Sequence, residues 1–327
     1  MNTGDADLER IVKAVLQAID RGAGGNTAGS TAVAAPARAA SAALPATPLP
    51  QLPMGVFASL DDAVAEADVA YRQMRSVAMR SRVVAAIRLA GEKHAQELAE
   101  LAVAETGMGR VADKFVKNVA QALHTPGVEC LVPTVLSGDH GLTLMENAAW
   151  GVVASVTPST NPAATLINNA ISMIAAGNSV VFAPHPAAKQ VSQRTVALLN
   201  QAVVAAGGPC NVITTVAQPN IATAQALFCY PGIHLLTVTG GEAVVEEARK
   251  HTDKRLIAAG AGNPPVVVDE TANLEKAARD IVWGASFDNN IICVDEKEVI
   301  VVASVADRLK AEMTKHKAVE LTADQAR

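Results

Sequence analysis

The stretch "GVVASVTPSTNPAATLINNAISMIAAGNSVVFAP", residues 151–184, decides the fold. It begins with a β-rich run over residues 151–158 and ends with another over residues 178–184. Between the two runs, apolar residues recur at helical spacing until Gly177 ends the pattern. Two short strands joined by a helix of this length form a βαβ unit, in which the strands run parallel. The stretch therefore predicts a parallel sheet.

The same alternation continues downstream. Three further β-rich runs and three helical segments follow, the runs at residues 211–216, 233–240 and 254–260 and the helices at residues 187–208, 220–230 and 242–251. Five strands with four crossovers build a parallel sheet covered on both faces, and such sheets bind ligands at the C-terminal ends of their strands. Half of the residues are hydrophobic and only 3% are aromatic, so Ala, Val, Leu and Ile supply the core. The predicted fold class is α/β.

Regular structure is also predicted on either side of this sheet. Helices are expected before it, from Ser59 to about residue 74, over residues 81–109 and over about residues 112–123. His94 lies on the apolar stripe of the second helix and is interpreted as a core or boundary side chain rather than a ligand. A second α/β segment is expected after the sheet, with strands at residues 264–270 and 296–303, a helix at residues 273–286 and a final helix.

The first 53 residues have a different organisation. Residues 1–21 predict an amphipathic helix, and residues 22–53, almost wholly Gly, Ala, Ser, Thr and Pro, predict a flexible linker. The helix either folds back on the body or caps an oligomer, or it lays its apolar stripe into a partner's groove. Its acidic residues exclude a mitochondrial presequence, and those acids are Asp5, Asp7 and Glu9.

Charge and cysteine usage narrow the class of protein. The net charge is −5 without a dense Lys/Arg cluster, so nucleic acid is not expected as a partner. No apolar run reaches the length of a membrane span. The four cysteines lie far apart without CxxC spacing, which favours reduced thiols and predicts no metal site. Cys130, Cys210 and Cys229 do not lie in polar loops, and Cys210 and Cys229 are expected to be packed residues.

Neither of the common phosphate-binding motifs, GxGxxG after a strand or GxxxxGK[ST], occurs in the sequence. A strand does run into Gly240 and Gly241 at the start of a helix, where backbone N–H groups can approach an anion. These glycines either allow an anion to bind to the backbone or are required only by the geometry of the turn. Asn161, in a Pro-flanked loop after the strand that ends at Pro158, is either a helix cap or an amide that stabilises a developing oxyanion.

Cys293 lies in the segment "SFDNNIICVDEKEVI", residues 286–300, just after a predicted helix. Asn289 and Asn290 precede it, and Asp295 and Glu296 follow it. A thiol in such a polar loop is a candidate nucleophile. The alternative is a buried, inert thiol.

Five segments together resemble the aldehyde dehydrogenase superfamily, and within it the CoA-acylating branch of bacterial microcompartments. The resemblance covers residues 56–327 and is most specific in "ETGMG", "TPSTNPAAT", "GNSVVFAPHPAAK", "TVTGG" and "FDNNIICVDEKEVIVV". It implies a Rossmann-type NAD-binding domain, within residues 54–258, and an incomplete α/β catalytic domain over residues 259–327. The propanediol-utilisation type is especially similar, and by this resemblance residues 5–20 are an encapsulation peptide that binds a shell protein.

The resemblance also implies roles for particular residues. Cys293 matches the catalytic nucleophile, and Asn161 matches the amide that holds the thiohemiacetal oxygen. The residues matched to the binding of NAD are Thr157, Pro158, Pro184, His185, Thr239, Gly240, Gly241 and Gly260. Ala259 stands where hydrolytic members have the glutamate that activates water, so CoA rather than water is expected to take the acyl group.

The resemblance thus implies oxidation of a short-chain aldehyde, with propanal expected, plus CoA and NAD+ to acyl-CoA and NADH. It implies a homo-oligomer located in the bacterial cytoplasm, inside a microcompartment. Members of the family continue well past the cysteine, so the sequence predicts a truncated chain that is poorly active by itself. Two alternatives stay open, a non-catalytic protein associated with the microcompartment and a hydrolytic aldehyde dehydrogenase.

Overall fold

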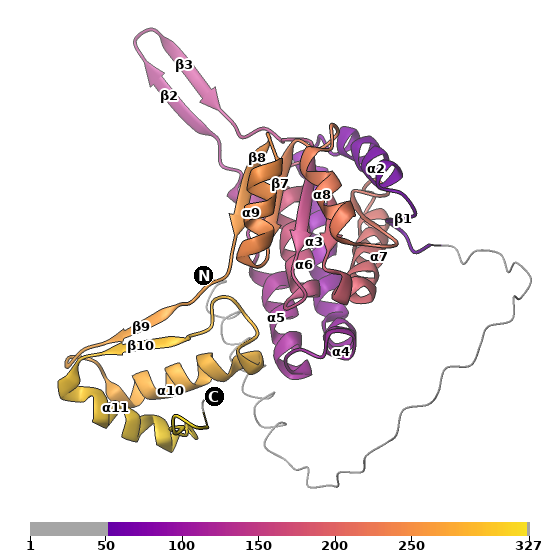
Figure 1. The fold of residues 1–327 in the computed structure, drawn as a ribbon. Helices are drawn as coiled ribbons and strands as arrows, with labels where there is room; N and C mark the ends of the chain where they lie inside the picture. Colours follow the sequence, from indigo (N-terminus) through magenta and orange to yellow (C-terminus); the bar gives the residue numbers. More distant parts are fainter. Residues whose placement is uncertain (1–51, 326–327) are drawn as a thin grey trace, which may run out of the picture. The chain divides into compact units, whose positions relative to one another are not determined.

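The computed structural model describes residues 52–325 (Figure 1). The helix predicted for residues 1–21 and the linker predicted for residues 22–53 lie outside the described residues, apart from the last two of the linker. Within residues 52–325, none of the helices combines the length and the apolar character needed to cross a membrane.

The centre of the fold is a six-stranded sheet with the strand order β1-β6-β5-β4-β7-β8. All neighbouring strands in it are parallel. The predicted five strands and the α/β class are confirmed, and the strands are β4 (Val152–Thr157), β5 (Ser179–Pro184), β6 (Ile213–Val216), β7 (Leu235–Thr239) and β8 (Arg255–Ala259). The sequence reading missed β1 (Val56–Phe57) at the edge, because two residues are too few to give a periodic signal.

Helices cover both faces of this sheet (Figure 1). One face packs against α3 (Val77–Lys93), α6 (Pro162–Ala175) and α7 (Lys189–Ala205), and the other against α2 (Leu60–Gln73), α8 (Ile221–Cys229) and α9 (Glu242–His251).

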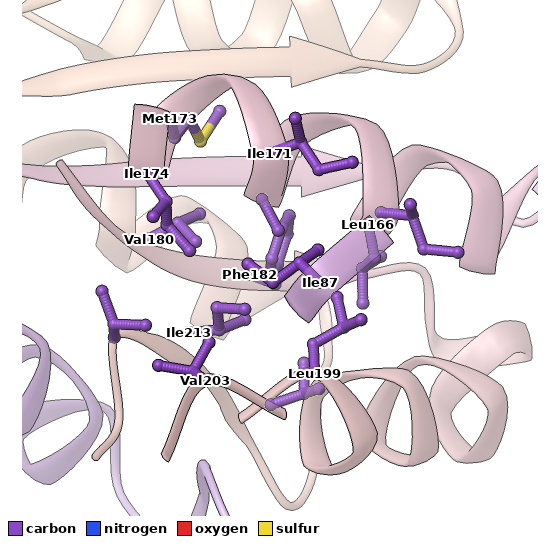
Figure 2. Close-up of a cluster of buried hydrophobic side chains, with 14 of the residues drawn as sticks. Ile87, Leu166, Ile171, Met173, Ile174, Val180, Phe182, Leu199, Val203 and Ile213 are labelled. Carbon is purple, nitrogen blue, oxygen red and sulfur yellow. The ribbon is translucent and has the colours of Figure 1, made fainter. Parts of the chain in front are cut away.

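Neighbouring residues of one strand therefore enter different cores. Val180 and Phe182 point into the first cluster, which Figure 2 shows with Ile87, Leu166 and Leu199, whereas Val181 belongs to the second. This alternation explains why β4 and β5 are apolar along most of their length and buried at every residue.

The helix predicted over residues 81–109 is two helices. Helix α3 ends and α4 (Ala95–Thr106) begins at His94, whose backbone angles, φ −99° and ψ 8°, leave the helical range. The His94 ring, 24% exposed, contacts the Glu97 carboxylate, so the interpretation as a boundary histidine is confirmed while the uninterrupted helix was wrong. The next predicted helix is confirmed as α5 (Val111–His124).

Residues between α5 and β4 form an unpredicted antiparallel hairpin. A short 3-10 turn, η1 (Val128–Cys130), leads into β2 (Thr134–Gly138) and β3 (Gly141–Met145), which pair with each other. Every residue of both strands is exposed. Apolar residues on these strands were not assigned to a sheet because they belong to no βαβ pattern.

The second α/β segment is confirmed. Strands β9 (Pro265–Val268) and β10 (Glu298–Val301) pair in parallel, and helices α10 (Leu274–Ser286) and α11 (Ala303–Lys315) share a small core with them. Between α10 and β10, the 3-10 turn η3 (Phe287–Asn290) opens the loop that carries Cys293. The outer face of the pair stays exposed, with Val267 at 73% and Ile300 at 57%.

Candidate functional site

The residues matched to cofactor binding lie along one edge of the central sheet. Thr157 at the end of β4 pairs in register with Pro184 at the end of β5, and Thr239 at the end of β7 pairs with Ala259 at the end of β8. Because these strands are parallel, their C-terminal ends share an edge, which is where sheets of this type bind ligands. The remaining matched residues directly follow these strand ends, and they are Pro158, His185, Gly240, Gly241 and Gly260.

The turn after β7 leaves a helix N-terminus open. Gly241 is the N-cap of α9, and no side chain caps this helix. A Cβ added at Gly241 would meet nothing within 4 Å, and one at Gly240 would meet only the Val244 Cβ, at 3.9 Å. The geometry of the turn therefore does not require both residues to be glycine, whereas the close approach of an anion to their backbone would benefit from it.

Helix α7, which follows the "FAPHPAAK" loop, has its first N–H groups occupied by the protein itself. The Glu105 carboxylate accepts hydrogen bonds from the backbone N–H groups of Gln190, at 2.7 Å, and Val191, at 2.8 Å. Within this loop, the exposed His185 ring accepts a hydrogen bond through Nδ1 from the backbone N–H of Ala187, at 3.1 Å. An anion is thus better accommodated at α9 than at α7.

Asn161 is the N-cap residue of α6, but its side chain does not cap the helix. The Asn161 Oδ1 accepts a hydrogen bond from Lys117 Nζ at 2.8 Å, and its Nδ2 donates one to Thr160 Oγ1 at 3.1 Å. The helix-capping alternative is wrong for this side chain. The amide is instead held from outside α6, at the same sheet edge as the matched cofactor residues.

A buried carboxylate lies behind Asn161. Asp288 in η3 is fully buried, and its Oδ2 accepts hydrogen bonds from Lys114 Nζ at 2.9 Å and from Lys117 Nζ at 2.5 Å. Its Oδ1 accepts one from the backbone N–H of Arg110 at 2.6 Å, just before the first turn of α5. Two cations and a helix N-terminus thus compensate the charge of this carboxylate. Burial lowers the pKa of Lys117, whereas the hydrogen bond and charge of Asp288 oppose that shift.

The backbone before Cys293 has an unusual conformation. Asp288, Asn289 and Asn290 have φ angles of 48°, 56° and 60°, in the left-handed region that Asn and Asp enter more readily than other non-glycine residues. Asn290 fixes the loop by donating through Nδ2 to the carbonyl groups of Ala285, at 2.8 Å, and Glu296, at 3.2 Å. The loop is therefore set by polar contacts rather than by apolar packing.

Cys293 is exposed, so the part of the alternative that expected a buried thiol is wrong. A Cβ added at Gly262 would overlap the backbone carbonyl of Cys293, so the chain after β8 comes into close contact with the cysteine loop. Lys117 Nζ also donates to the carbonyl of Ile291, two residues before Cys293, at 2.9 Å. The same ammonium thus contacts the loop that carries Cys293 and the amide of Asn161.

The expectation that Cys210 and Cys229 are packed residues was wrong. Both are exposed, as is Cys130, because each lies in a turn or at the end of a helix on the protein surface. The Cys229 thiol donates to the backbone carbonyl of His251 at 2.6 Å. Exposure therefore does not distinguish Cys293, whereas its link through Ile291 and Lys117 to Asn161 does.

One further carboxylate lies close to the nucleophile in sequence. Asp295 is 6% exposed, and among the described residues its Oδ2 has no hydrogen-bond partner. Burial raises the pKa of this carboxyl. Ala259, at the end of β8, supplies no carboxylate at the position matched to the water-activating acid.

The sequence reading missed Lys114, Lys117 and Asp288. The two lysines are three residues apart on α5, and their buried face also includes Asn118. Charged residues at that spacing on the buried face of a helix are a signal that could have been used, because lysine is almost never fully buried without a partner. Gly109 of "ETGMG" belongs to this site as well: its φ is 76°, and an added Cβ would overlap the Asp288 carboxylate.

The sequence and the fold of the chain are similar to those of known proteins. The profile of the aldehyde dehydrogenase family matches residues 40–326. The acetaldehyde dehydrogenase (acetylating) EutE of Escherichia coli is 76% identical to the chain over 273 residues, which are 84% of this chain and 58% of that protein. The chain thus spans less than two thirds of the length of this relative.

Two solved structures are also similar. A propionaldehyde dehydrogenase from a fucose-utilisation bacterial microcompartment of Clostridium phytofermentans shares 43% identity with a TM-score of 0.81, over 83% of this chain and 63% of that one. The propionaldehyde dehydrogenase of Rhodopseudomonas palustris, with bound CoA and an acylated cysteine, shares 46% identity with a TM-score of 0.80, over the same shares. From its profile match, its sequence relatives and its fold, the chain belongs to the aldehyde dehydrogenase family.

Proposed function

We propose that this protein oxidises a short-chain aldehyde with NAD+ and CoA to acyl-CoA and NADH, through a thioester on Cys293. One observation carries the proposal: an exposed cysteine loop and a side-chain amide at the ligand-binding edge of a parallel sheet share a single buried ammonium, that of Lys117. The acylated cysteine and CoA bound to the Rhodopseudomonas palustris relative support the same chemistry.

The steps follow from the residues of the site. The Cys293 thiolate adds to the aldehyde carbon, and the Asn161 Nδ2 donates to the oxygen that becomes negative. The carbonyl re-forms as a hydride leaves the carbon, and the acyl group stays on sulfur as a thioester. Gly240 and Gly241 at the sheet edge would hold NAD+, which would supply the acceptor for this hydride. The CoA thiolate then adds to the thioester, and Cys293 leaves as a thiolate.

The absence of a carboxylate at Ala259 favours CoA over water in the last step. A thiolate attacks a thioester without a general base, whereas water needs one. Asp288 does not replace that base, because it is engaged by Lys114, Lys117 and the backbone of Arg110. The hydrolytic alternative is therefore disfavoured.

The formation of NADH by the protein as its gene encodes it, followed at 340 nm with and without CoA, tests the proposal. Continuous turnover that requires CoA, and that is lost in Cys293→Ala, is expected. Continuous turnover without CoA would point to a hydrolytic enzyme, and silence in both conditions would favour the non-catalytic alternative. Either of these results would overturn the proposal.

Acetaldehyde and propanal are the two aldehydes to compare. The Escherichia coli relative is named for acetaldehyde, and both solved relatives are named for propionaldehyde, which is propanal. The sequence predicts propanal, whereas the 76% identity to the Escherichia coli relative favours acetaldehyde as a second candidate substrate. The ratio of kcat/KM for the two aldehydes, measured at saturating CoA, decides between them.

The same proposal includes a location inside a bacterial microcompartment, reached through residues 5–20. It is supported by the amphipathic pattern of that segment and by the microcompartment origin of the Clostridium phytofermentans relative. A fluorescent protein fused to residues 1–20 is expected to collect in microcompartments when shell proteins are co-expressed. Diffuse fluorescence in such cells would contradict this part of the proposal.

The proposal also includes a homo-oligomer and a division of the chain into a cofactor domain, residues 54–258, and the first part of a catalytic domain, residues 259–327. The homo-oligomer is supported by the exposed apolar side chains of β2 and β3, among them Leu136, which is 56% exposed, and Leu142, which is 69% exposed. The division into domains is supported by β8 and β9, which are neighbours in sequence but pair into different sheets. Light scattering coupled to size exclusion measures the oligomer.

A further inference from the structure

We propose that Lys117 is a positioning residue, which sets the orientation of the Asn161 amide and ties it to the loop of the nucleophile. The inference rests on the proposed function, because it assigns Lys117 a part in stabilising the oxyanion that Cys293 creates. Lys117 itself touches neither the substrate nor the reacting atoms; it acts through Asn161.

The contacts of Lys117 join three separate parts of the chain. Its Nζ lies 2.8 Å from Asn161 Oδ1, 2.9 Å from the carbonyl oxygen of Ile291 and 2.5 Å from Asp288 Oδ2. An ammonium group has three N–H donors, so these three acceptors use all of them. The side chain is 6% exposed, which leaves little room for water to replace any of the contacts. Asn161 and the cysteine loop are consequently held by one atom.

The chemistry of the ammonium fixes which way the amide points. An ammonium only donates hydrogen bonds, so the end of the Asn161 side chain that faces Lys117 must be the oxygen. The Nδ2 group is then at the other end, where one of its two N–H donors bonds to Thr160 Oγ1. Among residues 52–325 the second N–H has no hydrogen-bond acceptor, so it can donate to a substrate oxygen. With the amide reversed, an oxygen would face the negative charge that forms during the reaction.

Lys114 provides a matched comparison on the same helix. It is also buried, at 4% side-chain exposure, and donates to the same Asp288 oxygen, at 2.9 Å. Its other hydrogen bond goes to the backbone carbonyl of Thr160, at 2.8 Å, and not to Asn161 or Ile291. Removing either lysine leaves one cation beside Asp288. The two substitutions therefore differ chiefly in that only the loss of Lys117 removes the hydrogen bonds to Asn161 and to Ile291.

The first turnover isolates the step in which Asn161 acts. When enzyme is mixed with aldehyde and NAD+ without CoA, the rate of the NADH burst reports oxidation at each competent site, and its amplitude reports how many sites are competent. Lys117→Met is expected to slow the burst rate about 10- to 100-fold at an amplitude close to that of the wild type. Lys114→Met, which leaves the contacts of Lys117 with Asn161 and Ile291 in place, is expected to slow the burst less than Lys117→Met does, although both variants lower the Tm.

Asn161→Ala completes the test. It is expected to slow the burst about 100- to 1,000-fold, and the double variant Lys117→Met/Asn161→Ala is expected to be no slower than Asn161→Ala alone, because Lys117 acts through that amide. Additive losses in the double variant would overturn the inference. A lower amplitude with an unchanged rate in Lys117→Met would also overturn it, since that result describes a merely structural residue.

The outcomes separate this inference from the proposed function. A wild-type protein without any burst refutes the function itself, and the inference with it. If Asn161→Ala slows the burst but Lys117→Met does not, the inference is refuted and the proposed function is not. Lys117→Leu, which also removes the donors and the charge, replaces Lys117→Met if the latter does not fold, and a burst rate within twofold of the wild type would again refute the inference.

Discussion

The two halves of the site rest on different kinds of support. Asn161 follows β4, whose six residues are all buried between two layers of helices. Cys293 follows a turn in the second α/β segment, and both it and the next residue, Val294 at 68%, are exposed. Apolar burial fixes the position of the sheet edge, whereas hydrogen bonds and charges fix the loop of the thiol.

The two parts also differ in how directional their stabilising contacts are. Apolar packing is not directional, so the sheet tolerates many core side chains of suitable volume. The contacts between α5 and η3 are directional, because Lys114 and Lys117 both donate to the Oδ2 atom of Asp288. Loss of one polar partner should therefore affect the cysteine loop more than loss of a methyl group affects the sheet.

The largest expected effect on stability comes from Asp288→Ala. This change leaves Lys114 and Lys117 without their buried partner, and we expect the free energy of unfolding to fall by about 3–5 kcal/mol. Asp280→Ala, which breaks the exposed pair with Lys276, is the control and should cost about 0–1 kcal/mol. Urea unfolding measures both, and equal losses would show that the buried cluster does not hold the loop.

Substituting one isoleucine in the central sheet and one in the β9–β10 sheet compares how much each contributes to stability. Ile213 in β6 is fully buried, whereas Ile300 in β10 is 57% exposed. Ile213→Ala should lower the free energy of unfolding by about 2–5 kcal/mol. Ile300→Ala should change it by less than about 0.5 kcal/mol. A loss of several kcal/mol in Ile300→Ala would mean that its face of β9 and β10 is covered in solution.

The smallest expected effect concerns Asp295. Burial raises the pKa of this carboxyl above its ordinary value of 3.8, so its contribution to stability is fully present below pH 3.8 and is lost as the pH rises through the folded-state pKa. Asp295→Asn should therefore raise the Tm at pH 7 by about 2–4 °C, and this gain should shrink as the pH falls. A gain in Tm that is independent of pH would contradict a raised pKa for Asp295.

The sequence predicted the central sheet well and its surroundings less well. Strands such as β5 are apolar runs bounded by helices with clear ends, so periodicity alone located them. The break at His94 was not predictable, because the apolar stripe continues on both sides of it and only the backbone angles change. The β2–β3 hairpin was missed because its apolar residues belong to no βαβ pattern.

For the site, sequence reasoning named Cys293 and Asn161 but not what holds them. The contacts of Asp288 with Arg110, Lys114 and Lys117 span more than 170 positions in the chain, and no local pattern reports such a separation. The glycine of "ETGMG" at position 109 was quoted as a motif, whereas its reason, the close approach of the Asp288 carboxylate, is visible only in three dimensions. The roles proposed for the cofactor residues stay predictions.

The central claim, that Cys293 holds an acyl group which CoA removes and water does not, is tested most directly by the intact mass of the protein. After incubation with acetyl-CoA and removal of the excess, we predict the addition of one acetyl group, absent from Cys293→Ala. That group should persist in buffer and leave when CoA is added. An acetyl group retained by Cys293→Ala, or one that buffer removes as fast as CoA does, would contradict the claim.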